Sequence, residues 1–219
     1  MISLAVTLLL SHATLRLDEP VTIIASEDVW VYPMASDPGA DETFKVWGIE
    51  GKAVAGKPEE AESFGYGYLK FDFSAVPSGK KLVSAFMILK PIAKMTVDKN
   101  AKDYPLEVRP LVGKFAEKTF EHGMTATVYP GDSIFGTGVV APVVGSSDAK
   151  ELEIRVDLMA KKSPFTEMYG KAVSGDKAMF FALTSKYDAA ELGRDGIYRI
   201  YSRDRKEENM KPRIVLKFE

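Results

Sequence analysis

The sequence contains no cysteine, and this absence excludes several kinds of site. Without a thiol, the 219-residue chain has no disulfide framework, no thiolate metal ligand and no cysteine nucleophile. Stability therefore has to come from packing, and with 46% hydrophobic residues the chain can bury a large core. A domain of this size does not need disulfides, so their absence is compatible with export.

Histidine is nearly as rare, which argues against several catalytic centres. The two histidines are His12, in an N-terminal apolar segment, and His122, in a predicted loop, and they offer little to a histidine-rich metal centre or a Ser-His-Asp triad. Ser146 and Ser147 lie in VVGSSD, which lacks the G-x-S-x-G context of a hydrolase nucleophile. We therefore predict that the protein is not an enzyme and uses no organic cofactor.

The chain also lacks a strong charge of one sign. Its net charge is -2 and its isoelectric point is about 5.9, so it has no general attraction to nucleic acid. The apolar run at residues 2–10 is too short to cross a bilayer as a helix. We predict no nucleic-acid partner and no membrane span.

The N-terminal apolar run has the length of a signal-peptide core. It is followed by Ser11-His12-Ala13, a small-x-small cleavage site, but a basic n-region is missing. The alternative is an ordinary N-terminal strand or helix of the domain. We predict a signal peptide at residues 1–13 and one β-sandwich domain at residues 14–219, secreted or held at the cell surface, either free or as part of a larger protein.

From residue 21 onward, apolar and polar residues alternate with period two, which indicates β-strands. The predicted strands come about 10 to 20 residues apart without helical patterns between them, which favours an antiparallel sandwich over a βαβ fold. Only LMAKK, after Asp157, and SPFTEMYGKA indicate short connector helices. The predicted strands are VTIIA, DVWVYP, TFKVWG, GYGYLKFDF, KLVSAFMILKP, PLEVRPLV, ELEIRV, AMFFALTS, GIYRIYSR and PRIVLKF.

The segment GYLKFDFSAVPSGKKLVSAFMILK resembles a block of DNRLRE-type β-sandwich domains, which overlap with an alginate-binding family of carbohydrate-binding modules. The resemblance extends over residues 23–218. Phe115 stands where a tryptophan is commoner, and GKAVAGKPEEAES and residues 123–145 are longer than expected. The other segments that carry the resemblance are SEDVWVYP, ETFKVWG, LEVRPLVGKFAEKTFEHGM, ELEIRVDLMAKK, FFALTS and IYSRDRKEENMKPRIVLKF.

Together with the strand pattern, this resemblance predicts an all-β fold, an antiparallel sandwich of jelly-roll type with one or two short connector helices. It also implies a non-catalytic carbohydrate-binding module whose partner is an acidic or neutral polysaccharide. Contact residues do not follow from the family, because sandwich modules bind through loops and sheet faces that vary independently of the core.

Rows of aromatic and cationic side chains on the predicted strands suit such a ligand. Aromatic rings stack on sugar faces, and Arg or Lys donates to hydroxyls and uronate carboxylates. Exposed strand faces favour these residue types in any case, but residues 194–219 hold eight Lys/Arg against five Asp/Glu, which favours a binding role. On the predicted outer faces, the ligand-binding residues are Tyr66, Tyr68, Lys70, Arg199, Tyr201, Arg203, Arg213 and Lys217.

The two tryptophans, Trp30 and Trp47, have two interpretations. Each lies in a predicted strand and alternates with valines, so one set of side chains faces the core and the other faces solvent or a sheet edge. An exposed tryptophan is a stacking platform for sugar. Tryptophan is more often buried than exposed in proteins, so we expect at least one of the two to belong to the core.

The acidic, turn-rich loop SDPGADE, with Glu27 and Asp28 just upstream, is a candidate calcium site. Carboxylate oxygens in a flexible loop suit Ca²⁺, and the resemblance implies a structural calcium near the N-terminal strand. The alternative is an acidic turn that only solubilises a hairpin. The predicted ligands are Asp28, Asp37, Asp41 and Glu42.

Two other functions remain open. One is a structural or adhesive module of a surface or matrix protein. The other is a sandwich-fold polysaccharide lyase, in which Arg199, Tyr201 and Arg203 would serve the uronate and His122 would act as the base. The sequence lacks the Gln-x-His strand of such lyases, which makes this the weaker alternative.

Overall fold

A computed structural model describes residues 19–32, 35–37, 41–48, 64–92, 102–148 and 150–219. The predicted signal peptide and most of the GKAVAGKPEEAES insertion lie outside these residues. The described strands are β1 (Val21–Tyr32), β2 (Ala35–Asp37), β3 (Thr43–Val46), β4 (Tyr66–Asp72), β5 (Leu82–Leu89), β6 (Leu106–Val112), β7 (Tyr129–Pro130), β8 (Gly136–Gly138), β9 (Val140–Pro142), β10 (Leu152–Asp157), β11 (Ala178–Ser185), β12 (Tyr198–Tyr201) and β13 (Arg213–Phe218).

The strands form an antiparallel fold organised around β1, which confirms the predicted fold class. The N-terminal part of β1 pairs with β13 and its C-terminal part pairs with β4, with a bulge between Ala25 and Glu27 where the partner changes. One sheet continues through β13, β5, β10 and β9, and the other through β4, β11, β6 and β7, so the strand path does not close into a barrel. VTIIA and DVWVYP, predicted as two strands, are therefore one continuous strand.

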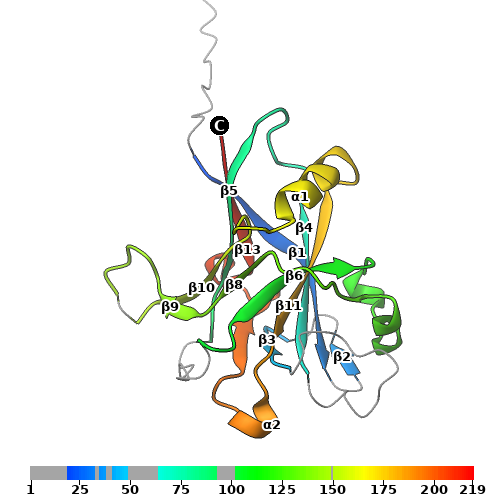
Figure 1. Cartoon of the computed structure of the whole chain (residues 1–219), viewed down its shortest axis with the longest axis vertical. Coiled ribbons are helices and arrows are strands. Elements are labelled where there is room, and N and C mark those ends of the chain that lie inside the picture. Colours follow the sequence, from blue (N-terminus) through cyan, green and yellow to red (C-terminus); the bar gives the residue numbers. More distant parts are fainter. Residues whose placement is uncertain (1–18, 33–34, 38–40, 49–63, 93–101, 149) are drawn as a thin grey trace, which may run out of the picture.

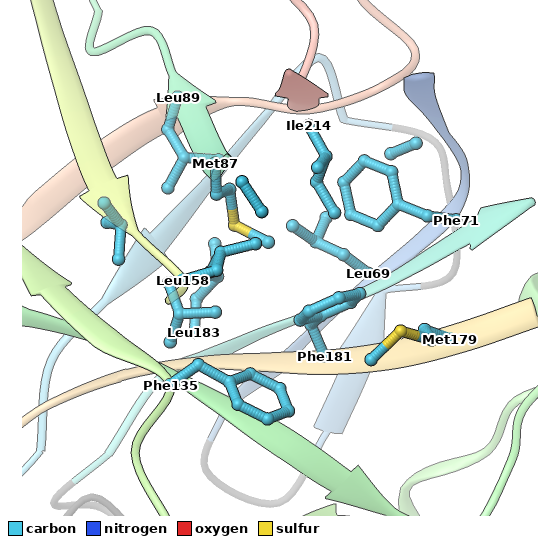
Figure 2. Close-up of a cluster of buried hydrophobic side chains, with 14 of the residues drawn as sticks. Leu69, Phe71, Met87, Leu89, Phe135, Leu158, Met179, Phe181, Leu183 and Ile214 are labelled. Atoms are coloured by element: carbon cyan, nitrogen blue, oxygen red, sulfur yellow. The ribbon is translucent and has the colours of Figure 1, made fainter. Parts of the chain in front are cut away.

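Side chains from both sheets meet in the main core, shown in Figure 2. Leu69 and Phe71 of β4 and Phe181 of β11 lie opposite Met87 of β5 and Ile214 of β13. The alternation predicted for β4 is confirmed on this inner face, because Leu69, Phe71 and Phe73 are all buried.

The sheets approach each other again where β8 passes β10. A Cβ atom on Gly136 would lie only 2.1 Å from the carbonyl oxygen of Asp157. Glycine is therefore required for this close backbone approach.

The outer face of β4 differs from the prediction. Tyr66 and Tyr68, expected in solvent, are 1% and 0% exposed. They belong to a second hydrophobic cluster beneath residues 113–128, which contain the short 3-10 helices η2 (Glu117–Thr119) and η3 (His122–Ala126). This segment contributes Phe115, Phe120 and Val128, so the second face of the sheet is covered as well.

Two short α-helices connect strands; α1 was predicted, whereas α2 was not and the helix predicted at LMAKK does not form. Helix α1 (Phe165–Ser174) buries Phe165, Tyr169 and Ala172 on one face, whereas α2 (Ala189–Leu192) lies at the opposite end of the sandwich in Figure 1. Pro164 is the residue before α1 rather than its first helical residue. After Asp157, LMAKK forms turns, with the Asp157 carboxylate accepting from the Met159 N–H at 2.9 Å. No helix in the described ranges is long and apolar enough to cross a membrane.

Candidate functional site

A small two-stranded sheet, β3 with β12, lies towards the end of the molecule that carries α2 (Figure 1). Strand β3 packs against β4, where the Phe44 ring lies over Gly67, and it is joined to β1 by a hydrogen bond from Trp30. Phe44 and Val46 of β3 are buried, so Thr43, Lys45 and Trp47 point the other way. Lys45 lies directly opposite Arg199 in the register. Both cations are exposed, and among the residues that the structure describes neither forms an ion pair.

Aromatic rings adjoin these two cations. Trp30 and Tyr32 follow each other on one face of β1 with ring centroids 4.2 Å apart, and the Trp47 ring lies 6.5 Å from Trp30. The ammonium group of Lys45 lies 5.6 Å from the Trp30 ring centroid. All three rings are half-buried. We call Trp30, Tyr32, Lys45, Trp47 and Arg199 the aromatic–cationic surface.

The orientation of both tryptophans is determined by backbone contacts. The Trp30 indole N–H donates to the carbonyl oxygen of Lys45 at 2.8 Å. Trp47 and Gly65 exchange two backbone hydrogen bonds, and the Trp47 ring covers Gly65 so closely that a Cβ atom there would lie 2.1 Å from it. These contacts hold both rings in place. Trp30 is partly buried and packs against the main core, which confirms in part the expectation that at least one tryptophan belongs to the core.

The other predicted ligand-binding residues do not converge on this surface. Tyr201, half-buried on β12, lies beneath the guanidinium of Arg205 at 5.0 Å. Lys70 is half-buried and pairs with Glu27. Arg213 and Lys217 lie on β13, alternating with core residues Ile214 and Leu216 of the other sheet.

Arg203 also differs from the prediction, which placed it in a row with Arg199 and Tyr201. Strand β12 ends at Tyr201, and Arg203 turns inward to a cluster of carboxylates. Its guanidinium donates to the carbonyl oxygen of Ser26 at 2.5 Å and lies 3.1 Å from the carboxylate of Glu117. The Arg203 side chain therefore makes its contacts within the protein and does not extend the row of Arg199 and Tyr201.

Asp28 lies at the centre of this carboxylate cluster and is only 3% exposed. Its carboxylate accepts the backbone N–H of Arg203 at 2.6 Å, and its own N–H donates to Glu117 at 3.1 Å. Burial raises the pKa of Asp28 to about 7, and repulsion by Asp204 and Glu117 acts in the same direction, outweighing the hydrogen bond from Arg203.

The pKa values of the two neighbouring glutamates, Glu27 and Glu117, are shifted in opposite directions. Burial is also the main reason that the pKa of Glu117 is raised. Burial opposes ionisation of Glu27 too, but hydrogen bonds from the Lys70 ammonium and the Glu117 N–H together lower its pKa. An open pocket of about 410 Å³ lies beside them, lined by Ser26, Glu27, Ala116, Glu117, Lys118 and Arg203.

The predicted calcium ligands are not brought together in the described residues. Asp28 holds Arg203, whereas Glu42 pairs with Arg205. The backbone carbonyl of Asp41 accepts from the Ser202 hydroxyl at 2.8 Å. The side chain of Asp37 lies outside the described residues, and within them no group of three acidic or histidine side chains is placed to hold a metal ion.

No protein-family model matches the sequence, and neither does any curated protein. The resemblance to DNRLRE-type domains therefore remains a prediction. Sequence reasoning identified Trp30, Trp47 and Arg199 but missed Tyr32 and Lys45. Period-two alternation offered a signal for both, because Tyr32 follows Trp30 and Lys45 precedes Trp47 by two residues.

Proposed function

We propose that the protein is a secreted or cell-surface carbohydrate-binding module that holds a polysaccharide on the aromatic–cationic surface. The observation that carries this proposal is the juxtaposition of the half-buried Trp30 and Tyr32 rings, 4.2 Å apart, with Lys45 over the Trp30 ring. Sugar rings present C–H groups that pack on aromatic faces. The indole held by the Lys45 carbonyl is ordered before a ligand arrives, which reduces the entropy lost on binding.

The charge of the surface favours an acidic polysaccharide such as a uronate polymer. Like charges directly opposite on neighbouring strands are destabilising, so the Lys45 and Arg199 pair is an unfavourable arrangement for the small sheet alone. A carboxylate bound between them relieves this repulsion and accepts charge-assisted hydrogen bonds from both. The same pair contributes little to the binding of a neutral glycan.

Affinity electrophoresis tests the proposal. Native gels containing alginate, pectin, xylan or β-glucan should retard the full chain in at least one case, with and without calcium, and without new ultraviolet absorbance from unsaturated uronate ends. Lys45→Ala with Arg199→Ala should abolish retardation by an acidic glycan while the thermal midpoint changes little, because both side chains are exposed.

The matched control is Lys80→Ala with Lys150→Ala. It removes the same charge from two exposed positions outside the surface, so it corrects for altered mobility in the gel. Equal loss of retardation in both double variants would contradict a specific surface. Free migration of the wild-type chain through every gel would overturn the proposal and favour a structural or adhesive module.

A further inference from the structure

The outward side of the small sheet continues beyond β12, because the chain that follows β5 runs alongside that strand. Pro91 forms a bridge with Ile200, and both residues are buried. The N–H of Ile92 donates to the Arg199 carbonyl at 3.0 Å. Side chains alternate along both segments, so Ile92 lies on the outward side together with Arg199.

This outward side is continuous with the outer face of β5. Met87 and Leu89 point into the main core, so Phe86 and Ile88 alternate onto the outer face, in line with Ile92. The rise of a strand places Ile88 about 13 Å from Ile92 along this face. The aromatic–cationic surface is therefore one end of a longer face, and the span from there to Ile88 takes several sugar rings.

Arg155 of β10 lies at the other end of this face. It is exposed and directly opposite Ile88 in the register, and its guanidinium lies 3.9 Å from the centroid of the Phe86 ring. Within the part of the chain that the structure describes, Arg155 makes no hydrogen bond or ion pair. A guanidinium stacked on an aromatic ring keeps its N–H groups available for a carboxylate. The arrangement repeats that of Lys45 over Trp30.

The carboxylates near Arg155 are engaged elsewhere. Glu151 forms an ion pair at 3.0 Å with the buried lysine at the end of β5, and the Asp157 carboxylate accepts a backbone N–H at 2.9 Å. Glu153 is buried and stabilises the charged form of Arg213, on the other side of β5. An anion that approaches Arg155 therefore meets a cation whose charge is not already neutralised.

We propose that Arg155 is a second contact for the same acidic polysaccharide, so that one glycan chain runs from the aromatic–cationic surface along the outer face of β5 to Arg155. This inference rests on the proposed function. One such contact by itself does not offset the entropy lost on association, but a chain already held by Lys45 and Arg199 has met most of that loss. A long chain then reaches Arg155 at high effective concentration. Arg155 therefore strengthens the binding of long chains only.

The test is the dependence of affinity on the length of the glycan, with uronate oligosaccharides of increasing length prepared from alginate and from pectin as probes. Tryptophan fluorescence reports binding, because both tryptophans of the chain lie in the aromatic–cationic surface. Wild-type affinity should gain about tenfold once the oligosaccharide is long enough to reach Arg155. Arg155→Gln should bind short oligosaccharides as wild type does and lack this gain.

Lys80→Gln is the matched control, because it removes one charge from an exposed position before β5 and should keep the wild-type length dependence. The same length dependence in wild type and Arg155→Gln would overturn the inference and leave the proposed function intact. Equal weakening of short and long oligosaccharides in Arg155→Gln would overturn it as well. If neither the oligosaccharides nor the intact polymers bind wild type, the proposed function fails and this inference fails with it.

Discussion

The backbone N–H of Arg203 donates a 2.6 Å hydrogen bond to the carboxylate of Asp28, across 175 residues of sequence. Burial holds the pKa of this carboxyl at about 7, above its ordinary value of 3.8, so the folded state binds the proton more tightly than the unfolded state. The stabilisation of the folded state by protonated Asp28 is complete below about pH 4 and is lost as the pH rises through about 7.

From this follows a prediction about the pH dependence of stability. Between about pH 5 and about pH 8, wild type should lose on the order of 2–3 kcal/mol of unfolding free energy relative to Asp28→Asn. Urea denaturation of both proteins across that range measures the difference, and subtracting one curve from the other removes the groups they share. Parallel curves would show that Asp28 does not titrate as described.

Tyr68 should be a structural residue rather than a sugar contact. Its ring is fully buried, meets Phe120 edge-on at 5.9 Å, and its hydroxyl donates to the Val128 carbonyl at 3.3 Å. Tyr68→Ala is expected to cost about 3–5 kcal/mol of unfolding free energy through the cavity it creates. Tyr68→Phe should cost only about 1 kcal/mol, the value of one hydrogen bond. Chemical denaturation provides both values, and glycan retention by the folded fraction should not change.

Glu107 and Arg109 of β6 form an ion pair and are only 6% and 4% exposed. Arg109 also donates to Thr184 at 3.2 Å and to the carbonyl oxygens of Gly131 and Asp132 at 3.1 and 3.0 Å. Arg109→Met leaves Glu107 buried without its partner and should cost about 3–5 kcal/mol. Adding Glu107→Leu should recover much of that loss, as thermal denaturation will show. A double variant no more stable than the single one would mean that the hydrogen bonds to the loop matter more than the charge.

Gly65→Ala should displace Trp47 from the aromatic–cationic surface, because the new Cβ atom would occupy the position of the indole ring. We expect a red shift of tryptophan fluorescence as the ring moves into solvent, together with weaker glycan retention. Gly79→Ala in the turn before β5 has open space around its Cβ position and serves as a control for the glycine substitution itself, although its φ of +75° makes it somewhat destabilising. Unchanged fluorescence in Gly65→Ala would show that the Trp47 contact is not maintained in solution.

Lys45→Glu should change the stability of the protein and its binding of an acidic glycan in opposite directions. The new carboxylate would lie directly opposite Arg199 and convert a repulsive cross-strand pair into an attractive one. The thermal midpoint should therefore rise slightly, by the equivalent of about 0.2–1 kcal/mol, while retention by an acidic glycan is lost. A variant that becomes less stable and loses retention would suggest that Lys45 supports the sheet instead of the ligand.

The strand pattern was readable from the sequence because the side-chain period of a strand is local. Alternation predicted the core-facing set Leu69, Phe71 and Phe73 correctly. It also identified most longer strands, whereas the short β2, β7, β8 and β9 were missed because two or three residues do not establish a period.

Alternation could not show whether the outer face of β4 is exposed to solvent. Alternation places Tyr66 and Tyr68 on one side of β4, but whether that side meets water depends on residues 113–128, which lie more than forty positions away. The amphipathic look of tyrosine, with an apolar ring and a polar tip, suits an exposed strand and a second core equally well.

Local residue order thus accounts for the strands, their inward faces and the presence of exposed aromatic and cationic residues. The grouping of Trp30 and Tyr32 with Lys45 and Arg199, and of Asp28 with Arg203, arises because the small sheet packs on β4 and is hydrogen-bonded to β1. Such contacts join segments far apart in the chain, and their free energy comes from burial and hydrogen bonds that exist only after folding. A local sequence pattern does not predict such contacts, so the candidate site could be recognised only from the tertiary structure.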